Sequence, residues 1–313
     1  MSYRNHLPQL DGGVFLTDGG IETTLIFHEG LDLPLFAAFD LLKDDDGTAA
    51  VRRYYEPYAA LAREHDVGFV LESPTWRASP RWAGELGYNE AELDKLNRKA
   101  IALMEEIRGE FDSDGAPIVI SGCVGPHDDG YSPATKLAAP DARDYHATQI
   151  ATFAETAADM ITAMTMTYAE EAIGVALAAQ QHRLPAAISF TVETDGRLPS
   201  GQALGEALRQ TDHETNALPS YYMINCAHPT HFEAVFAAHE AWHDRIRGLR
   251  ANASTKSHAE LDEATELDEG DPADLGRRYA ELRAKLPQLT ILGGCCGNDH
   301  RHVGEASKAS LAG

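Results

Sequence analysis

The sequence predicts an α/β fold, and within that class a single (β/α)8 TIM barrel over residues 1–313. Eight short apolar runs rich in β-branched residues recur from end to end, and segments with helix-start chemistry separate them. Several of the runs are continuously apolar, as in parallel strands buried on both faces. No low-complexity linker divides the chain, so we expect one domain. A doubly wound sheet with six or seven strands is the alternative.

The predicted strands are Val14–Thr17, Val67–Glu72, Pro117–Val124, Asp159–Thr165, Ala186–Val192, Tyr221–Cys226, Ile246–Ala251 and Thr290–Gly293. In a barrel of this kind the carboxyl ends of all strands open onto one face. We therefore expect the functional side chains directly at or after the ends of these runs.

Helix starts are predicted where a capping side chain precedes a helical segment, because its oxygen satisfies a free backbone N–H. From the strongest pattern to the weakest, the predicted starts are Asn89 with Glu92, Thr230 with Glu233, Asp271 before Pro272, Asp141 and Thr48. Residues 260–274 depart from the general pattern because they are crowded with acids. We expect them to form an exposed loop after the seventh strand.

The chain is strongly acidic, with 49 acidic against 26 basic side chains and a formal charge of -23. This balance argues against binding to nucleic acid and to anionic membrane surfaces, which need Lys and Arg contacts. No apolar run of about 18 residues and no secretory leader is visible. Four cysteines do not form a disulfide framework in a chain of this length. We expect a cytoplasmic monomer or small homo-oligomer.

Two adjacent cysteines end the last predicted strand, in Gly293-Gly294-Cys295-Cys296-Gly297. Both can ligate one soft metal only where the backbone turns sharply, and the flanking glycines permit this because they tolerate positive φ. A vicinal disulfide or two unrelated core cysteines are the alternatives. Cys226 ends the sixth predicted strand and favours the metal, because it opens onto the same face. Three thiolates with an open fourth position are typical of catalytic zinc.

Other candidate residues lie at the ends of the first two strands. Asp18, in Thr17-Asp18-Gly19-Gly20, meets the amino group of a substrate, orients a ligand, or is an ordinary acid in a tight turn. Glu72, Thr75 and Trp76 follow the second strand and are predicted to line a pocket, although Trp76 equally fits a packing role.

Three residues near strand ends are predicted to be structural. Cys123 fits a buried neutral thiol. His228 and His231 follow Cys226 closely, but their spacing matches no zinc pattern, so we expect loop or capping roles. No glycine-rich phosphate loop or dinucleotide fingerprint follows a strand.

With these residues in place, the chain resembles the homocysteine S-methyltransferase family, whose members are zinc-dependent (β/α)8 barrels. The resemblance spans nearly the whole chain and is carried by Thr17-Asp18-Gly19-Gly20, Ile188-Ser189-Phe190-Thr191-Val192 with Gly196, Leu198, Gly201 and Leu204 following, Asn225-Cys226, and Gly293-Gly294-Cys295-Cys296-Gly297. It implies that Cys226, Cys295 and Cys296 bind Zn²⁺ and that Asp18 helps to hold an amino acid substrate. The remaining candidate substrate-binding residues are Gly19, Glu72, Thr75, Met164 and Asn225.

One position departs from the family pattern. Family members commonly carry a glutamate at the end of the fourth strand, which contacts the amino group of homocysteine, and Met164 occupies that position in this chain. A neutral side chain cannot pair with an ammonium group. We therefore expect homocysteine to bind weakly, or the acceptor to carry less positive charge, unless an acid such as Glu170 or Glu193 takes over the contact.

The resemblance implies transfer of a methyl group from a sulfonium or quaternary ammonium donor, of the S-methylmethionine, S-adenosylmethionine or betaine type, to a thiol acceptor. With homocysteine or a relative as acceptor, the product is methionine or a methyl thioether. A free thiol with a pKa of about 8.5 is mostly protonated at neutral pH, and coordination removes its proton. Two alternatives are a zinc-dependent hydrolase, although three thiolates make a poor Lewis acid, and a non-catalytic zinc- or thiol-binding protein.

Overall fold

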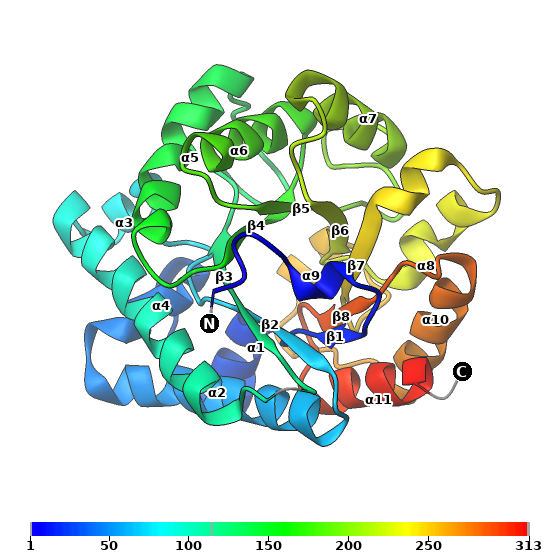
Figure 1. Ribbon diagram of the computed structural model, residues 1–313, viewed down its shortest axis with the longest axis horizontal. Helices are drawn as coiled ribbons and strands as arrows, with labels where there is room; N and C mark the ends of the chain where they lie inside the picture. The colour runs from blue at the N-terminus through cyan, green and yellow to red at the C-terminus, as the bar shows by residue number, and fades with distance from the viewer. Residues whose placement is uncertain (1, 114, 312–313) are drawn as a thin grey trace.

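Eight parallel strands close into a barrel in the computed structural model, which describes residues 2–113 and 115–311 (Figure 1). The strands are β1 Phe15–Leu16, β2 Gly68–Glu72, β3 Ile118–Val124, β4 Met160–Met166, β5 Ala186–Phe190, β6 Tyr221–Asn225, β7 Ile246–Ala251 and β8 Ile291–Gly294. Each strand pairs with the next along the chain, and β8 pairs with β1. The predicted TIM barrel is therefore correct, and the doubly wound sheet is excluded.

Helices surround the barrel and connect successive strands (Figure 1). They are α1 Ile21–Thr23, α2 Asp45–Glu64, α3 Pro80–Glu85, α4 Glu90–Phe111, α5 Ala139–Ala154, α6 Ala169–Gln181, α7 Leu204–Thr215, α8 Pro229–Phe232, α9 His258–Asp262, α10 Pro272–Lys285 and α11 His300–Leu311. Short helical turns are η1 Pro8–Leu10, η2 Thr24–His28, η3 Pro34–Phe36, η4 Ala38–Lys43, η5 Glu233–Phe236 and η6 Ala241–Arg245.

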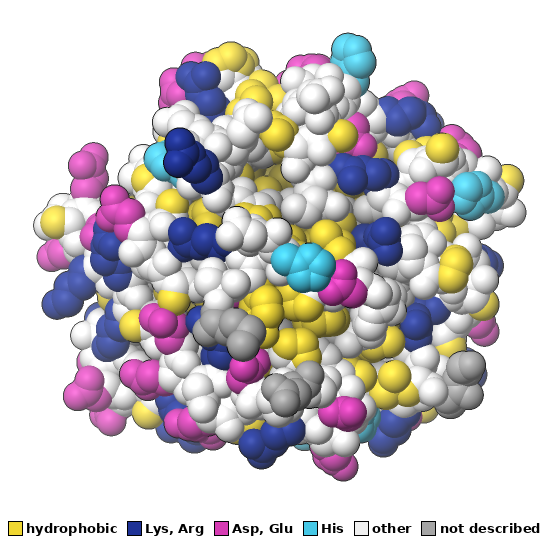
Figure 2. All heavy atoms as spheres, in the orientation of Figure 1, with side chains coloured by type: hydrophobic (Ala, Val, Ile, Leu, Met, Phe, Trp, Pro, Cys, Tyr) yellow, Lys and Arg dark blue, Asp and Glu magenta, His cyan; other side chains and the backbone are white. Residues whose placement is uncertain are grey.

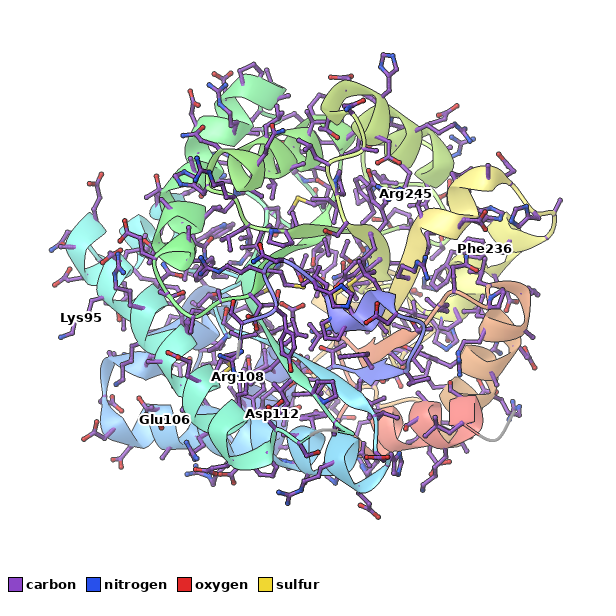
Figure 3. All side chains as sticks on the ribbon, viewed as in Figure 1. Lys95, Glu106, Arg108, Asp112, Phe236 and Arg245 are labelled. Atoms are coloured by element: carbon purple, nitrogen blue, oxygen red, sulfur yellow. A yellow bond between two sulfur atoms is a disulfide. The ribbon has the colours of Figure 1, made fainter. Side chains whose placement is uncertain are left out.

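Helix α4 shows how these helices separate a solvent face from a packed face. Lys95 and Glu106 point away from the barrel, whereas Arg108 points toward it (Figure 3). The Arg108 guanidinium pairs at 2.8 Å with the buried carboxylate of Asp159, next to the start of β4. This ion pair joins the outer helix to the barrel wall.

Two of the predicted helix starts are confirmed. Asn89 accepts hydrogen bonds from the Ala91 and Glu92 backbone N–H groups, and the Glu92 carboxylate accepts one from the Asn89 N–H in return. Asp271 accepts from the Ala273 N–H at the start of α10. Both caps satisfy N–H groups that the first helical turn leaves free.

The other predicted caps are wrong. Thr230 lies inside α8, and the ring of His228 caps that helix instead, because the intervening proline fits the first helical position. Thr48 lies inside α2, whose cap is Asp44. Asp141 lies in the first turn of α5 rather than before it.

The barrel interior changes from apolar to polar toward the carboxyl ends of the strands. The apolar level consists of inward-facing side chains that include Val70, Val119, Met160, Ala187, Met223 and Ile291. Two positions further along five of these strands, on the same face, are the buried polar residues Glu72, Ser121, Thr162, Ser189 and Asn225. The N-terminal segment crosses the opposite end of the barrel (Figure 1), where Leu7 joins the apolar level.

Acidic and basic side chains are interspersed over the face that Figure 2 shows. Among the described residues, none of the helices has the length and apolarity that a bilayer crossing requires.

Candidate active site

A cavity of about 390 Å³ opens at the carboxyl ends of the strands. Most of the residues singled out in the sequence line it, namely Asp18, Gly19, Glu72, Trp76, Met164, Asn225, Cys226, Cys295 and Cys296. Thr75 does not, contrary to the prediction, because its hydroxyl donates to the Cys123 carbonyl at 2.7 Å behind the cavity wall. Cys123 is a buried free thiol, as predicted, but it also lines the cavity, and burial raises its pKa well above the ordinary value.

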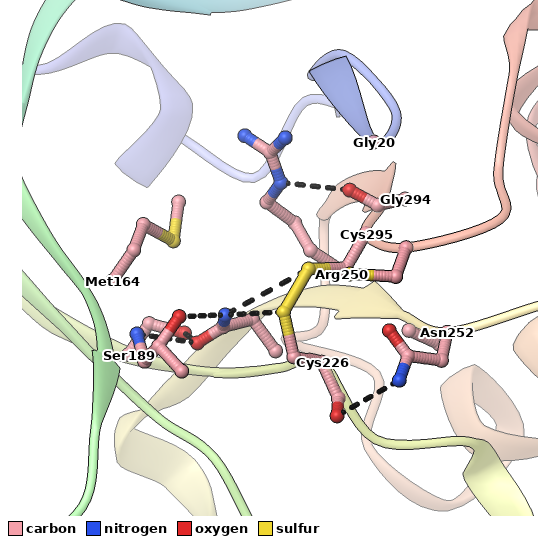
Figure 4. Close-up of a disulfide and its surroundings, with 12 residues drawn as sticks. Gly20, Met164, Ser189, Cys226, Arg250, Asn252, Gly294 and Cys295 are labelled. Atoms are coloured by element: carbon pink, nitrogen blue, oxygen red, sulfur yellow. Dashed lines mark hydrogen bonds between the residues drawn. A yellow bond between two sulfur atoms is a disulfide. The ribbon is translucent and has the colours of Figure 1, made fainter. Parts of the chain in front are cut away.

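The sulfur atoms of Cys226, Cys295 and Cys296 lie within 4.8 Å of one another. The structure thus brings together the three cysteines that the sequence grouped by their places at strand ends. Cys226 and Cys295 are joined by a disulfide (Figure 4), and Cys296 is free. The expectation that all three are unpaired thiolates is therefore not met in this state of the protein. The vicinal pair, Cys295 with Cys296, does not form the bond.

The backbone at Cys226 adopts a left-handed conformation with φ of 55°. Three contacts hold it there. Its N–H donates to the Arg250 carbonyl at 3.0 Å, and its own carbonyl accepts from the Asn252 amide at 3.1 Å and from the ring of His258. Such a conformation is unfavourable for a residue with a side chain and persists only where the surroundings impose it. The sequence carries no signal for this feature.

Glycines in the segment after β1 allow it to pack closely against the segment that carries Cys295 and Cys296. A side-chain carbon on Gly19 would lie 2.5 Å from the Asn298 carbonyl oxygen, and one on Gly20 would lie 2.5 Å from the Cys295 carbonyl oxygen. Gly297 alone of the glycines around the two cysteines has the predicted positive φ, at 77°. The aspartate-glycine-glycine and cysteine-cysteine segments therefore interlock after β1 and β8, which are paired strands.

Asn225 orients the sulfur of Cys226. Its side-chain N–H group donates to the Cys226 sulfur at 3.2 Å and to the Thr165 hydroxyl at 2.8 Å. Its side-chain oxygen accepts from the Thr165 N–H at 2.9 Å and from the Ser189 hydroxyl at 2.6 Å (Figure 4). These four bonds fix the amide in one orientation, so Asn225 acts on the sulfur in addition to lining the cavity.

Asp18 is 2% exposed and is fully engaged by its own chain. It pairs with the Arg250 guanidinium at 2.9 Å and accepts hydrogen bonds from the Tyr54 hydroxyl at 2.9 Å and the Thr17 hydroxyl at 3.0 Å. Arg250 also donates to the carbonyls of Gly19 and Gly294. Sequence reasoning missed Arg250. The sequence feature that could have indicated its role is a basic residue near the end of the seventh predicted strand.

Glu72 is 3% exposed and far less well satisfied. One carboxylate oxygen accepts from the Thr162 hydroxyl at 2.7 Å, and the other is buried without a hydrogen-bond partner among the described residues. Burial raises the pKa of Glu72 to about 7, against the opposing effects of the Arg250 charge and the hydroxyls of Thr162 and Ser121.

Met164 lies on the cavity wall near the end of β4, as the sequence predicts. The two acids that the sequence offered as replacements are not on that wall. Glu170 accepts from the Gln210 amide at 3.2 Å, and Glu193 contacts the His258 ring at 3.2 Å.

The acidic segment 260–274 follows β7 and is largely exposed, as predicted. The prediction of a simple loop is incomplete, because the segment contains the end of α9 and the start of α10 and forms part of the cavity wall. The wall residues from this segment are Leu261, Asp262, Ala264, Glu266, Leu267 and Asp268.

Fold and site together define a class of protein, a (β/α)8 barrel with three clustered cysteine sulfurs and buried acids at the catalytic end of the barrel. The sequence model of the family described as "Homocysteine S-methyltransferase" matches residues 15–310. The chain belongs to the homocysteine S-methyltransferase family, and it is a methyltransferase.

Solved structures with the same fold include the homocysteine methyltransferase MmuM from Escherichia coli in three forms. The oxidized form has a TM-score of 0.73 at 18% identity, covering 94% of this chain and 95% of that one. The metallated form has a TM-score of 0.71 at 16% identity, covering 96% of each chain. The apo form has a TM-score of 0.65 at 17% identity, covering 95% of this chain and 96% of that one. No curated protein matches this chain in sequence.

Proposed function

We propose that the protein is a zinc-dependent S-methyltransferase that moves a methyl group from a sulfonium or quaternary ammonium donor to the thiol of homocysteine or a close relative. The observation that carries this proposal is the cluster of three cysteine sulfurs within 4.8 Å at the mouth of the barrel. Membership of the family supports homocysteine as the acceptor. Asp18 and the other lining residues would form the walls of the acceptor site.

The donor set fits zinc. Three soft sulfur ligands suit a tetrahedral Zn²⁺ and leave one position for a substrate thiol. The disulfide between Cys226 and Cys295 has to be reduced first, which an external thiol does by exchange. A zinc ion bound by the three thiolates supplies the means to hold the acceptor sulfur as a thiolate at neutral pH.

The chain's own residues do the positioning. Asn225 fixes the direction of the Cys226 sulfur, and the Asp18–Arg250 pair fixes the adjoining wall, because Arg250 is the register partner of Asn225 on β7. The cavity encloses the two reactants together, so that an attacking sulfur and a methyl carbon can be held in line. In the transfer a new sulfur–carbon bond forms as the donor's bond to the same carbon breaks, and the donor leaves as a neutral thioether or tertiary amine.

The lining of the cavity favours a positively charged donor. Its described wall contains seven acids against two arginines, the acids being Asp18, Glu22, Glu72, Asp129, Asp262, Glu266 and Asp268. Aromatic side chains at the same wall are Phe27, Phe36, Tyr55, Trp76 and Tyr131. Acids attract a sulfonium or quaternary ammonium group by charge, and aromatic faces stabilise it by cation–π contact.

Metal analysis of reduced, zinc-reconstituted protein tests the proposal. We expect about one zinc per chain, a sharp loss in Cys226→Ser, Cys295→Ser and Cys296→Ser, and retention in the control Cys123→Ser. Incubation of the loaded protein with homocysteine and S-methylmethionine, S-adenosylmethionine or betaine should give methionine. Full zinc retention in Cys295→Ser, or hydrolysis products in place of a methylated thiol, would overturn it.

A further inference from the structure

We propose that Glu72, at the end of β2, binds the ammonium group of the acceptor amino acid and so replaces the carboxylate that Met164 lacks on β4. This inference rests on the proposed function, because it names the acceptor as an amino acid thiol. It assigns the contact to a different strand from the one that the family pattern uses.

Asp18 is poorly suited to bind the ammonium by itself. Its charge is already balanced by Arg250 at 2.9 Å, and both of its oxygens accept further hydrogen bonds within the chain. An incoming ammonium would have to share a carboxylate with a guanidinium in a buried site, where two cations repel each other strongly. We therefore assign Asp18 a structural role, in which its carboxylate holds the Arg250 guanidinium in place.

Glu72 has the properties that Asp18 lacks. Its second oxygen is buried with no hydrogen-bond partner among the described residues, although buried acceptors are nearly always paired. Its raised pKa, about 7 because of burial, indicates a carboxylate without an adequate counter-charge. An ammonium group would supply the missing hydrogen bond and the missing charge together.

Glu72 also reaches the side of the cavity where the family's acid would stand. Its carboxylate accepts a hydrogen bond from Thr162, an inward-facing residue of β4 two positions before Met164. The β2 carboxylate therefore extends across the barrel interior to β4. Met164 is left as an apolar wall beside it.

Glu22 is the rival acid on the cavity wall. Burial raises its pKa to about 7 as well, and the charge of Asp18 adds to this rise, whereas a backbone hydrogen bond and the charges of Arg250 and Arg77 oppose it. Glu22 is next to Thr23, whose hydroxyl accepts a hydrogen bond from the Gly297 backbone N–H at 3.2 Å, so Glu22 lies at the cysteine end of the cavity. Glu72, by contrast, is 3% exposed and has a buried oxygen without a hydrogen-bond partner among the described residues, whereas Glu22 is only partly buried.

Calorimetric titration of the reduced, zinc-loaded protein separates these roles. The probes are homocysteine and 4-sulfanylbutanoate, which has the same length but no amino group. We expect the wild type to prefer homocysteine by about tenfold or more, the discrimination typical of a charged hydrogen bond. Glu72→Gln should lose this preference while binding 4-sulfanylbutanoate at least as well, and Glu22→Gln should keep it. The matched control is Glu170→Gln, an acid of α6 outside the cavity.

Moving the carboxylate provides the converse test. The double variant Glu72→Gln/Met164→Glu takes the acid from β2 to β4, and we expect it to regain the preference for homocysteine that the single variant loses. A wild-type preference retained in Glu72→Gln, or lost in Glu22→Gln, would overturn the inference. Melting temperature and zinc content confirm that each variant is folded and loaded.

The wild type alone also tests the contact. At pH 6 Glu72 is largely protonated if its pKa is about 7, and it must ionise to bind an ammonium. Titration in two buffers of different ionisation enthalpy should therefore show up to about one more proton released with homocysteine than with 4-sulfanylbutanoate. Equal proton release, with both thiols bound equally well, defeats this inference and leaves the proposed function standing. Failure of both thiols to bind defeats the proposed function itself.

Discussion

Two neighbouring strands of the barrel, β1 and β2, treat a buried acid at the cavity in opposite ways. Asp18 follows β1 and is held by Arg250 and two hydroxyl groups, whereas Glu72 ends the neighbouring strand β2 and is held by one hydroxyl. Both side chains are almost completely buried, so exposure to solvent does not explain the difference. An acid that the chain pairs internally contributes to the scaffold, and an acid that it leaves unpaired is available to a ligand.

The largest expected effect comes from breaking the internal pair. Arg250→Met leaves Asp18 buried without its counter-charge, and we expect a loss of about 4 kcal/mol in the free energy of unfolding at pH 7. The reciprocal Asp18→Asn should lose about 3 kcal/mol, because the guanidinium then faces a neutral amide. Urea denaturation of metal-free protein measures both. A loss below about 1 kcal/mol in both variants would mean that the pair is not structural.

On β2, by contrast, removing the charge of Glu72 should stabilise the protein. The folded-state pKa of Glu72 is raised from 4.5 to about 7, so the folded state binds this proton more tightly than the unfolded state. The wild type therefore loses stability as the pH rises from about 4.5 to about 7, and Glu72→Gln should be more stable at pH 8 by up to roughly 3 kcal/mol. At pH 4 the two proteins should unfold alike.

Urea denaturation across this pH range measures the effect, with Glu170→Gln as a control that should show no such trend. A Glu72→Gln variant that is less stable than the wild type at pH 8 would show that Glu72, like Asp18, is paired within the chain.

The smallest expected effect concerns the hydrogen bond that Thr162 donates to Glu72. Thr162→Val removes that hydroxyl, and we expect a loss of about 1 kcal/mol at pH 8. In the Glu72→Gln background the loss should shrink, because the bond no longer serves an ionised group. A double-mutant cycle between the two positions isolates this term. An equal loss in both backgrounds would show that Thr162 matters only for packing.

The fold was predictable because its signal is local. Each of the eight predicted runs contains its strand or misses it by one residue, as at β4 and β8. The clustering of Cys226 with Cys295 and Cys296 was predictable as well, because all three follow or end strands of one parallel barrel.

Contacts between distant segments were not predictable. The pairing of Asp18 with Arg250 exists only because β7, β8 and β1 are consecutive strands of the closed barrel. The position of Thr75 depends on the turn after β2, where its hydroxyl bonds to the β3 backbone instead of facing the cavity. The disulfide between Cys226 and Cys295 requires the same close approach of sulfurs as a shared metal, so sequence patterns alone do not separate the two states.

The left-handed backbone at Cys226 places two kinds of selection in conflict. Glycine adopts this conformation freely, whereas for cysteine the conformation is unfavourable by about 1 kcal/mol or more. A library selected only for heat resistance would gain from Cys226→Gly, the substitution that also deletes a sulfur from the cluster. A library selected for methyl transfer would keep the cysteine and accept the backbone penalty. The residue found at this position after selection therefore indicates whether heat resistance or methyl transfer was selected.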